Sequence, residues 1–193
     1  MSQVSIVEVV TEPTLEPIDL EAAKRHLFIA STSFIHDEYV TTLIQAAREQ
    51  WESDTDSAVM SQTLKVTASN FCGSAMYLPR RPISSITSVT YYDSSNALQT
   101  LATSVYALDK QARAIRLKVD QVWPGVESSR FDAIAVTYVA GVATQATVPA
   151  IAKQAMMLLI GYYFDANRGD NDRANDLRAY ESLVLRYMRS TYP

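Results

Sequence analysis

Cysteine, histidine and glycine are scarce in this chain of 193 residues, and each shortage excludes a class of function. The single cysteine, Cys72, cannot form a disulfide within the chain, and cysteine-rich zinc sites are excluded as well. Only His26 and His36 are available for catalysis by histidine. No GxSxG, HExxH, P-loop or GxGxxG pattern occurs. We therefore expect a protein that is not an enzyme and that needs no metal and no cofactor.

A surplus of positive charge is also missing. The formal net charge is −4 and the isoelectric point is about 5.2, whereas proteins that coat nucleic acid carry a basic face and a high isoelectric point. The longest apolar stretch, residues 155–164, is too short to span a bilayer. The first residues lack the basic and apolar segments of a signal peptide. These features predict a globular protein of the cytoplasm that does not enter a membrane.

Two early segments have helical periodicity. Asp19 is placed as an N-cap, and the apolar residues that follow predict a short helix over residues 20–27. A longer helix is predicted from about Asp37, with one continuous apolar stripe formed by Val40, Leu43, Ile44, Ala47 and Trp51. The segment up to about Pro17 contains two prolines, Pro13 and Pro17, and is expected to form an extended arm.

Between about Gln62 and Gly141 the period changes to two, which is typical of half-buried strands. The alternating residues are Leu64, Val66 and Ala68; Val89 and Tyr91; Ile115, Leu117 and Val119; and Ile134, Val136 and Tyr138. The stretch from Asp93 to Asn96 predicts a hairpin turn, because Asp and Asn side chains bond to nearby backbone.

Helical periodicity returns at Pro149, a residue favoured at the start of helices. An apolar helix is predicted to run towards a C-cap at Gly169, followed by a polar link over residues 170–176. A last helix carries Leu177, Tyr180, Val184 and Tyr187 on one face, and the tail from Arg189 is expected to be loose.

The order of elements predicts an α+β fold in one domain that covers residues 1–193. Its helical core is expected to come from N- and C-terminal helices, at about residues 19–58 and 149–189. An antiparallel β subdomain, at about residues 62–141, is expected to be inserted between them.

Several segments in this order resemble the head–tail connector family of tailed bacteriophages, also called adaptor or head-completion proteins, and its relatives in gene transfer agents. The resemblance rests on residues 20–27, 37–49 and 78–93, on Trp123-Pro124, on residues 136–141 leading to 148–151, and on Asn167-Arg168. No single motif is specific, and the resemblance lies in their order and spacing.

This resemblance implies a structural protein of the virion neck, assembled in the host cytoplasm. Such proteins form a ring, twelvefold when assembled, that docks on the portal protein, commonly through the C-terminal region. The ring extends the DNA channel and joins the head to a neck or tail completion protein. DNA passes through without sequence-specific binding, and a mildly acidic wall suits this role because it does not hold phosphate.

Six residues are candidates for protein interfaces, where tyrosine and arginine are enriched. They are Arg80, Arg81, Tyr180, Tyr187, Arg189 and Tyr192. For the C-terminal tyrosines the alternative is a core position with the hydroxyl at the surface. For Arg80 and Arg81, which lie between prolines, the interface alternative is a bridge to an acidic neighbour in the ring, and the other is an exposed loop without a partner.

Other interpretations stay open at this point. Acids and amides from Asp165 to Asp176 resemble a calcium loop, but the glycine is misplaced and the last ligand is not Glu, so a solvated link between helices is favoured. Cys72 is read as a small buried or half-buried thiol. The alternative functions are a binding subunit of another phage-tail-like or secretion assembly, of the tail-terminator type, and an enzyme with an unfamiliar site.

Overall fold

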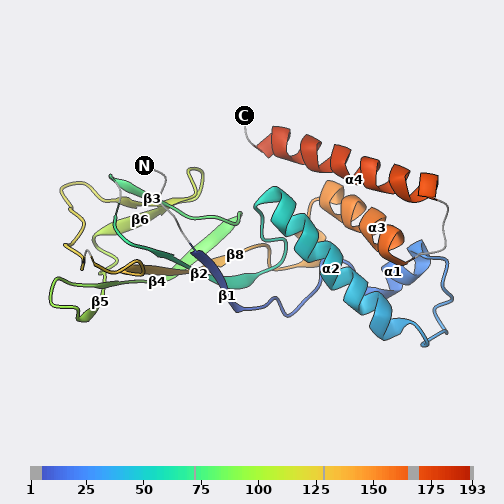
Figure 1. Ribbon diagram of the computed structural model, residues 1–193, viewed down its shortest axis with the longest axis horizontal. Helices are drawn as coiled ribbons and strands as arrows, with labels where there is room; N and C mark the ends of the chain where they lie inside the picture. The colour runs from blue at the N-terminus through green and yellow to red at the C-terminus, as the bar shows by residue number, and fades with distance from the viewer. Residues whose placement is uncertain (1–5, 72, 128, 165–169, 192–193) are drawn as a thin grey trace. The chain divides into compact units, whose positions relative to one another are not determined.

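The computed structural model describes residues 6–71, 73–127, 129–164 and 170–191, and it divides the chain into two compact units (Figure 1). The β unit consists of Met1–Thr14 and Ser61–Gly141. The helical unit consists of Leu15–Met60 and Val142–Pro193. The predicted α+β fold, with helices from both ends of the chain and antiparallel strands between them, is confirmed.

The β unit contains two antiparallel sheets. The larger has the order β1-β2-β8-β4-β5, and the smaller has the order β3-β7-β6. In β2 and β8 every second side chain is buried, as the alternating sequence predicts, and Tyr138 in β8 is fully buried. The strands are β1 (Ile6–Thr11), β2 (Gln62–Ala68), β3 (Ala75–Tyr77), β4 (Ile83–Tyr92), β5 (Leu98–Thr100), β6 (Tyr106–Asp109), β7 (Ala114–Leu117) and β8 (Ile134–Ala140).

The predicted hairpin turn after β4 is present. Asp93 accepts hydrogen bonds at its Oδ1 from the backbone N–H groups of Ser95 and Ala97, at 2.9 and 3.1 Å. Asn96 has a φ of 58°, a conformation that Asn tolerates better than most residues. These backbone bonds hold the pKa of the Asp93 carboxyl below its ordinary value, with further help from the Gln99 side chain.

Two expectations for the β unit are wrong. The segment before Pro17 is not simply an arm, because β1 pairs antiparallel with β2 as an edge strand of the larger sheet. Its described side chains are all exposed, so they show no alternation that sequence reasoning can detect. Val119 does not continue β7: the strand ends at Leu117, Asp120 follows with a φ of 59°, and Val119 is 87% exposed.

The helical unit packs around one hydrophobic core. Its elements are α1 (Leu20–His26), α2 (Asp37–Thr55), the short 3₁₀ helix η1 (Gln145–Thr147), α3 (Ala150–Phe164) and α4 (Asp170–Thr191). The predicted N-cap of α1 is confirmed, since Asp19 Oδ1 accepts the N–H of Ala22 at 2.7 Å. The apolar stripe of α2 is buried against α3, which carries buried residues around much of its circumference.

The C-terminal boundaries differ from the prediction. Residues 170–176 belong to the first turns of α4 rather than to a polar link, and Asp and Asn suit a helix start because they interact with free N–H groups. The tail is not loose at Arg189, since α4 continues to Thr191. The predicted C-cap at Gly169 and the reading of Cys72 as a buried thiol both fall outside the described residues.

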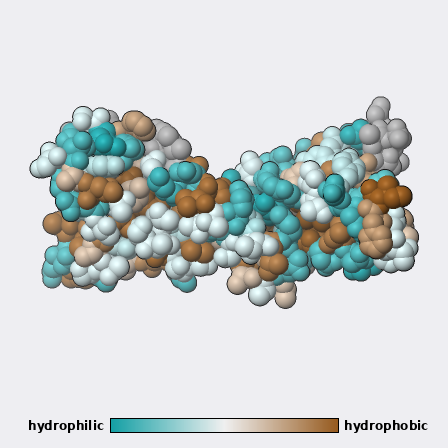
Figure 2. All heavy atoms as spheres, turned by 90° about the horizontal axis from the view of Figure 1, so that it is seen from below, coloured by the Kyte–Doolittle hydropathy of each residue, from teal (hydrophilic) through white to brown (hydrophobic). Residues whose placement is uncertain are grey.

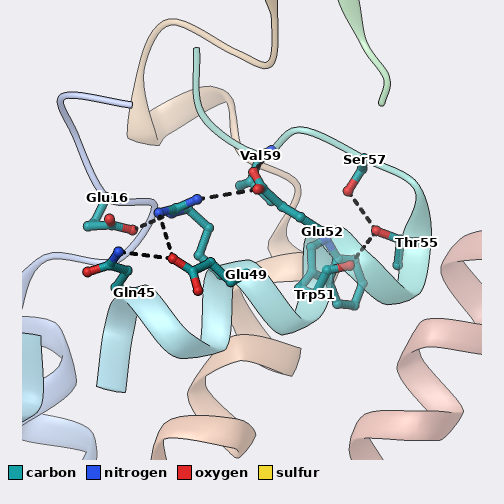
Figure 3. Close-up of polar contacts among 9 residues, drawn as sticks. Glu16, Gln45, Glu49, Trp51, Glu52, Thr55, Ser57 and Val59 are labelled. Atoms are coloured by element: carbon teal, nitrogen blue, oxygen red, sulfur yellow. Dashed lines mark hydrogen bonds and ion pairs between the residues drawn. The ribbon is translucent and has the colours of Figure 1, made fainter. Parts of the chain in front are cut away.

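Buried charges in α2 tie together the segments where the chain enters and leaves the helical unit (Figure 3). The Arg48 guanidinium contacts Glu16 at 2.9 Å and Glu52 at 3.3 Å, and the side chains of Arg48 and Glu52 are 3% and 4% exposed. The second Glu52 oxygen accepts the N–H of Val59 at 2.7 Å. Each buried charge therefore has an opposite charge or a backbone dipole beside it, which burial requires.

We call Glu16, Arg48 and Glu52, with their bonded neighbours, the charge clamp. The segment that begins at Val142, where the chain enters the helical unit again, also bonds to it. The side chain of Gln145 donates to the backbone oxygen of Glu16 at 2.6 Å. The N–H of Val142 donates to the backbone oxygen of Val59 at 3.3 Å, next to a bridge between Met60 and Val142. The chain crosses the boundary of the helical unit three times, and the residues of the helical unit next to each crossing are joined by these hydrogen bonds.

Arg48→Ala is expected to lower the free energy of unfolding by about 3–5 kcal/mol, because it leaves Glu52 buried without its opposite charge. Gln45→Ala on the same helix removes an exposed hydrogen bond to Glu49 and is expected to change stability by about 0.5 kcal/mol or less. Denaturant unfolding of the two variants measures the difference. Equal stability of the two would contradict a structural role for the charge clamp.

Candidate interaction surfaces

The outward face of α4 is the most basic helical face among the described residues of the helical unit. Arg178, Arg186 and Arg189 are exposed there, with Glu181 as the acid among the exposed residues of this helix. Arg178, Ser182, Leu185 and Arg189 recur at intervals of three and four, so they lie along one face. Together these six residues line a shallow groove of about 530 Å³. Arginines in such a row suit contact with carboxylates of a protein partner.

The inward face of α4 is part of the core, and it contains two of the predicted interface residues. Tyr180 is only 3% exposed, and its hydroxyl donates to Asp54 at 2.6 Å. Tyr187 is half-buried with its ring 5.1 Å from that of Trp51. In this chain Tyr180 therefore holds α4 against α2 and presents no free surface to a partner.

The remaining interface candidates have different surroundings. Arg189 is exposed on the outward face of α4, and Tyr192 lies beyond the residues that the structure describes. Arg80 is half-buried with a φ of 60°, and Arg81 is only 7% exposed. The loop that holds them is fixed at Pro79, whose backbone oxygen accepts the Tyr138 hydroxyl at 2.7 Å. One of the two interpretations placed Arg81 in an exposed loop, and the structure does not support it.

Burial shapes the ionisation of the tyrosines near α4. It raises the pKa of Tyr180, and the hydrogen bond to Asp54 and the charge of that carboxylate raise it further. Burial also raises the pKa of Tyr163 in α3. Both hydroxyls stay protonated at neutral pH, and that of Tyr180 donates to Asp54.

A second hollow lies between α2, α3 and α4, with a volume of about 690 Å³. Its apolar wall includes Leu159, Leu177, Val184 and Leu185, and the rings of Tyr162 and Tyr163 also face it. Gln50, Asp54 and Glu181 supply polar groups at its lining. We call it the α2–α4 groove. Most of its wall is apolar, so it fits an apolar side chain.

Sequence reasoning missed one surface altogether. Phe28, Phe34 and Ile35 lie in the loop between α1 and α2 and are 97%, 75% and 89% exposed. A signal was present, since large apolar residues in a link between two predicted helices are unusual for a solvent-facing segment.

Chemistry-bearing residues do not converge in the described parts of the chain. No three His, Cys, Asp or Glu side chains there are grouped closely enough to hold a metal ion. His26 is exposed at the end of α1, and His36 is exposed at the N-cap of α2 with its ring 6.0 Å from Phe164.

Within the described ranges, no helix combines the length and hydrophobicity needed to cross a bilayer.

The fold is shared with chains of gene transfer agent (GTA) particles. A chain in the virion of a native GTA particle has a TM-score of 0.75 and 20% identity, over 94% of each chain. A chain in the neck of an empty GTA particle, computed with C6 symmetry, has a TM-score of 0.71 and 16% identity, over 91% of this chain and 94% of that one.

A third chain, in the neck of a native GTA particle computed with C12 symmetry, has a TM-score of 0.65 and 19% identity, over 85% and 86% of the two chains. No family model matches this chain, and no curated protein matches it in sequence. The predicted resemblance to phage-like connector proteins is therefore confirmed at the level of the fold.

Tyr180→Phe is expected to lower the free energy of unfolding by about 1 kcal/mol, because it removes the bond to Asp54. A tyrosine whose pKa is higher in the folded chain loses its stabilising effect as pH rises above its unfolded value of about 10. Above that pH the stability of the variant should therefore fall less steeply than that of the wild type. The matched change Tyr39→Phe, at an exposed 3.3 Å bond to the Tyr163 backbone, should have a smaller effect at both pH values.

Proposed function

We propose that this chain is a structural adaptor in the neck of a tailed phage or phage-like particle. In this role, copies of the chain form a ring that docks on the portal, extends the DNA channel and joins the head to the neck and tail. The likeness to a GTA virion chain, which spans 94% of both chains, carries the proposal. Necks with C6 and C12 symmetry contain chains of the same fold, and rotational symmetry relates identical copies in a ring.

The surfaces of the helical unit support a role in assembly. The described residues present exposed arginines on α4 and an apolar groove beside it, and arginine-rich and apolar surfaces are typical of protein interfaces. We infer that the outward face of α4, with Arg178, Arg186 and Arg189, is the surface that docks on the portal. The net charge of −4 suits a channel wall along which DNA slides, because it provides few sites for counterion release.

The direct test of the adaptor role is deletion of the gene from the particle that encodes it, followed by electron microscopy. Separate tails beside heads that have lost their DNA are the expected products, and the wild-type gene supplied from a plasmid should restore joined particles. Normal infectious particles without the gene would overturn the proposal.

The portal-docking surface has its own test. Reversing the charges in Arg178→Glu, Arg186→Glu and Arg189→Glu together is expected to weaken portal binding by roughly 10–100-fold, since each exposed ion pair contributes about 0.2–1 kcal/mol. The control is Lys110→Glu, Arg116→Glu and Lys118→Glu, which changes the net charge equally at exposed positions of the β unit. Similar affinities of the two triple variants in a portal pull-down would place the docking surface outside α4.

A further inference from the structure

Large hydrophobic side chains gather on the loop that joins α1 to α2. We call Phe28, Phe34 and Ile35 the apolar knob; their exposed fractions of 97%, 75% and 89% are among the highest of the described large hydrophobic residues. Single exposed apolar residues are ordinary, but several on one short loop mark an interaction site. In Figure 2, brown hydrophobic atoms lie on the surface at the end of the helical unit where this loop is found.

The backbone at Phe28 is unfavourable for its side chain. Phe28 has a φ of 58° and follows the C-cap of α1, where the N–H of Ile29 donates to the Lys24 backbone oxygen at 2.9 Å. This is the helix-ending position that glycine normally occupies, because a Cβ is strained there. The Phe28 ring gains no burial in return. Folding of the single chain therefore does not explain a phenylalanine at this position.

A buried lysine holds the loop in place. The Lys24 side chain is 1% exposed, and its Nζ donates to the backbone oxygens of Ser31 and Ser33 at 3.2 and 2.7 Å. The same ammonium lies 2.8 Å from Asp37 and 5.4 Å from the centre of the Phe34 ring. The knob is thus ordered before any partner arrives, which lowers the entropy lost on binding.

The same unit carries a hollow of matching chemistry at another place. The α2–α4 groove has a volume of about 690 Å³, within the range of pockets that bind ligands, and its wall is mostly apolar. Gln50 on its lining lies roughly 20 Å along α2 from Asp37, where the knob's loop ends, at 1.5 Å per residue. The charges also correspond, since Arg25 is exposed beside the knob and Asp54 and Glu181 line the groove.

We propose that the apolar knob of one copy inserts into the α2–α4 groove of the next copy around the ring. This inference rests on the ring of the proposed function and names the contact that closes it. A protruding patch and a complementary pocket at different places on one chain form a head-to-tail contact, and such contacts generate closed rings when the rotation fits. Because both surfaces belong to the same compact unit, every copy offers one of each.

Cross-linking of two single-cysteine proteins tests the contact. One carries Ile35→Cys in the knob and the other carries Gln50→Cys at the groove, both in a Cys72→Ser background so that no other thiol competes. Mild oxidation of the mixture is expected to give heterodimers several-fold in excess over a control that pairs Gln50→Cys with Phe131→Cys. Phe131 is a matched control because, like Ile35, it is a large hydrophobic residue that is mostly exposed, at 77%, but it lies in the β unit.

A second variant separates assembly from folding. Adding Phe28→Gly to the knob protein is expected to reduce the heterodimer to the control level. Its thermal midpoint should stay unchanged or rise by up to about 4 °C, since glycine relieves the strained backbone. Loss of cross-linking with a markedly lower midpoint would show that Phe28 acts in folding, and would overturn the inference.

The outcomes also distinguish this contact from the adaptor role. Equal yields from the knob and control pairs would overturn the contact, and deletion of the gene would still report on the adaptor role. The contact would also be overturned if Phe28→Gly left the copies cross-linked but abolished portal binding, because the knob would then bind the portal. If the cross-links were specific but particles formed normally after deletion of the gene, the contact between copies would stand and the adaptor role in the neck would be rejected.

Discussion

The helical unit depends on two buried charged side chains, Arg48 and Glu52, each of which has a bonded partner that offsets the cost of its burial. Arg48 and Glu52 lie on one buried side of α2, and their partners, Glu16 and the backbone of Val59, belong to the segments that enter and leave the unit. Because removal of one partner strands the other in an apolar surrounding, the segments are held more firmly than hydrophobic packing alone would hold them. Lys24 does the same for the loop before α2, because its buried ammonium contacts Asp37 at the start of the helix.

This anchoring has a consequence for assembly. With the core satisfied by α3 and by the inward face of α4, the groups left at the surface are available to other molecules: the arginines of α4, the α2–α4 groove and the apolar knob. The last two are separate surfaces, but Glu181 and Leu185 line both the arginine face of α4 and the α2–α4 groove. The buried Tyr180 likewise serves the packing of α4, because its hydroxyl donates to Asp54.

Much of the fold followed from periodicity, and the misses have physical causes. The α2 stripe and the alternation in β2 and β8 were reliable because each buries one face. The edge strand β1 was missed because its side chains are exposed, and the start of α4 was taken for a link because Asp and Asn also favour loops. Two of the interface candidates, Tyr180 and Arg81, are buried in the single chain. The charge clamp and the knob depend on contacts between segments distant in sequence, which periodicity does not report.

The central proposal is that this chain is a ring component of a particle neck. The most direct measurement is quantitative mass spectrometry of purified particles, combined with immunogold labelling to locate the chain. The account predicts a single labelled site at the junction of head and tail, with about twelve copies per particle if its ring has the C12 symmetry of the related native neck. Absence from purified particles, or label spread over the whole capsid, would contradict it.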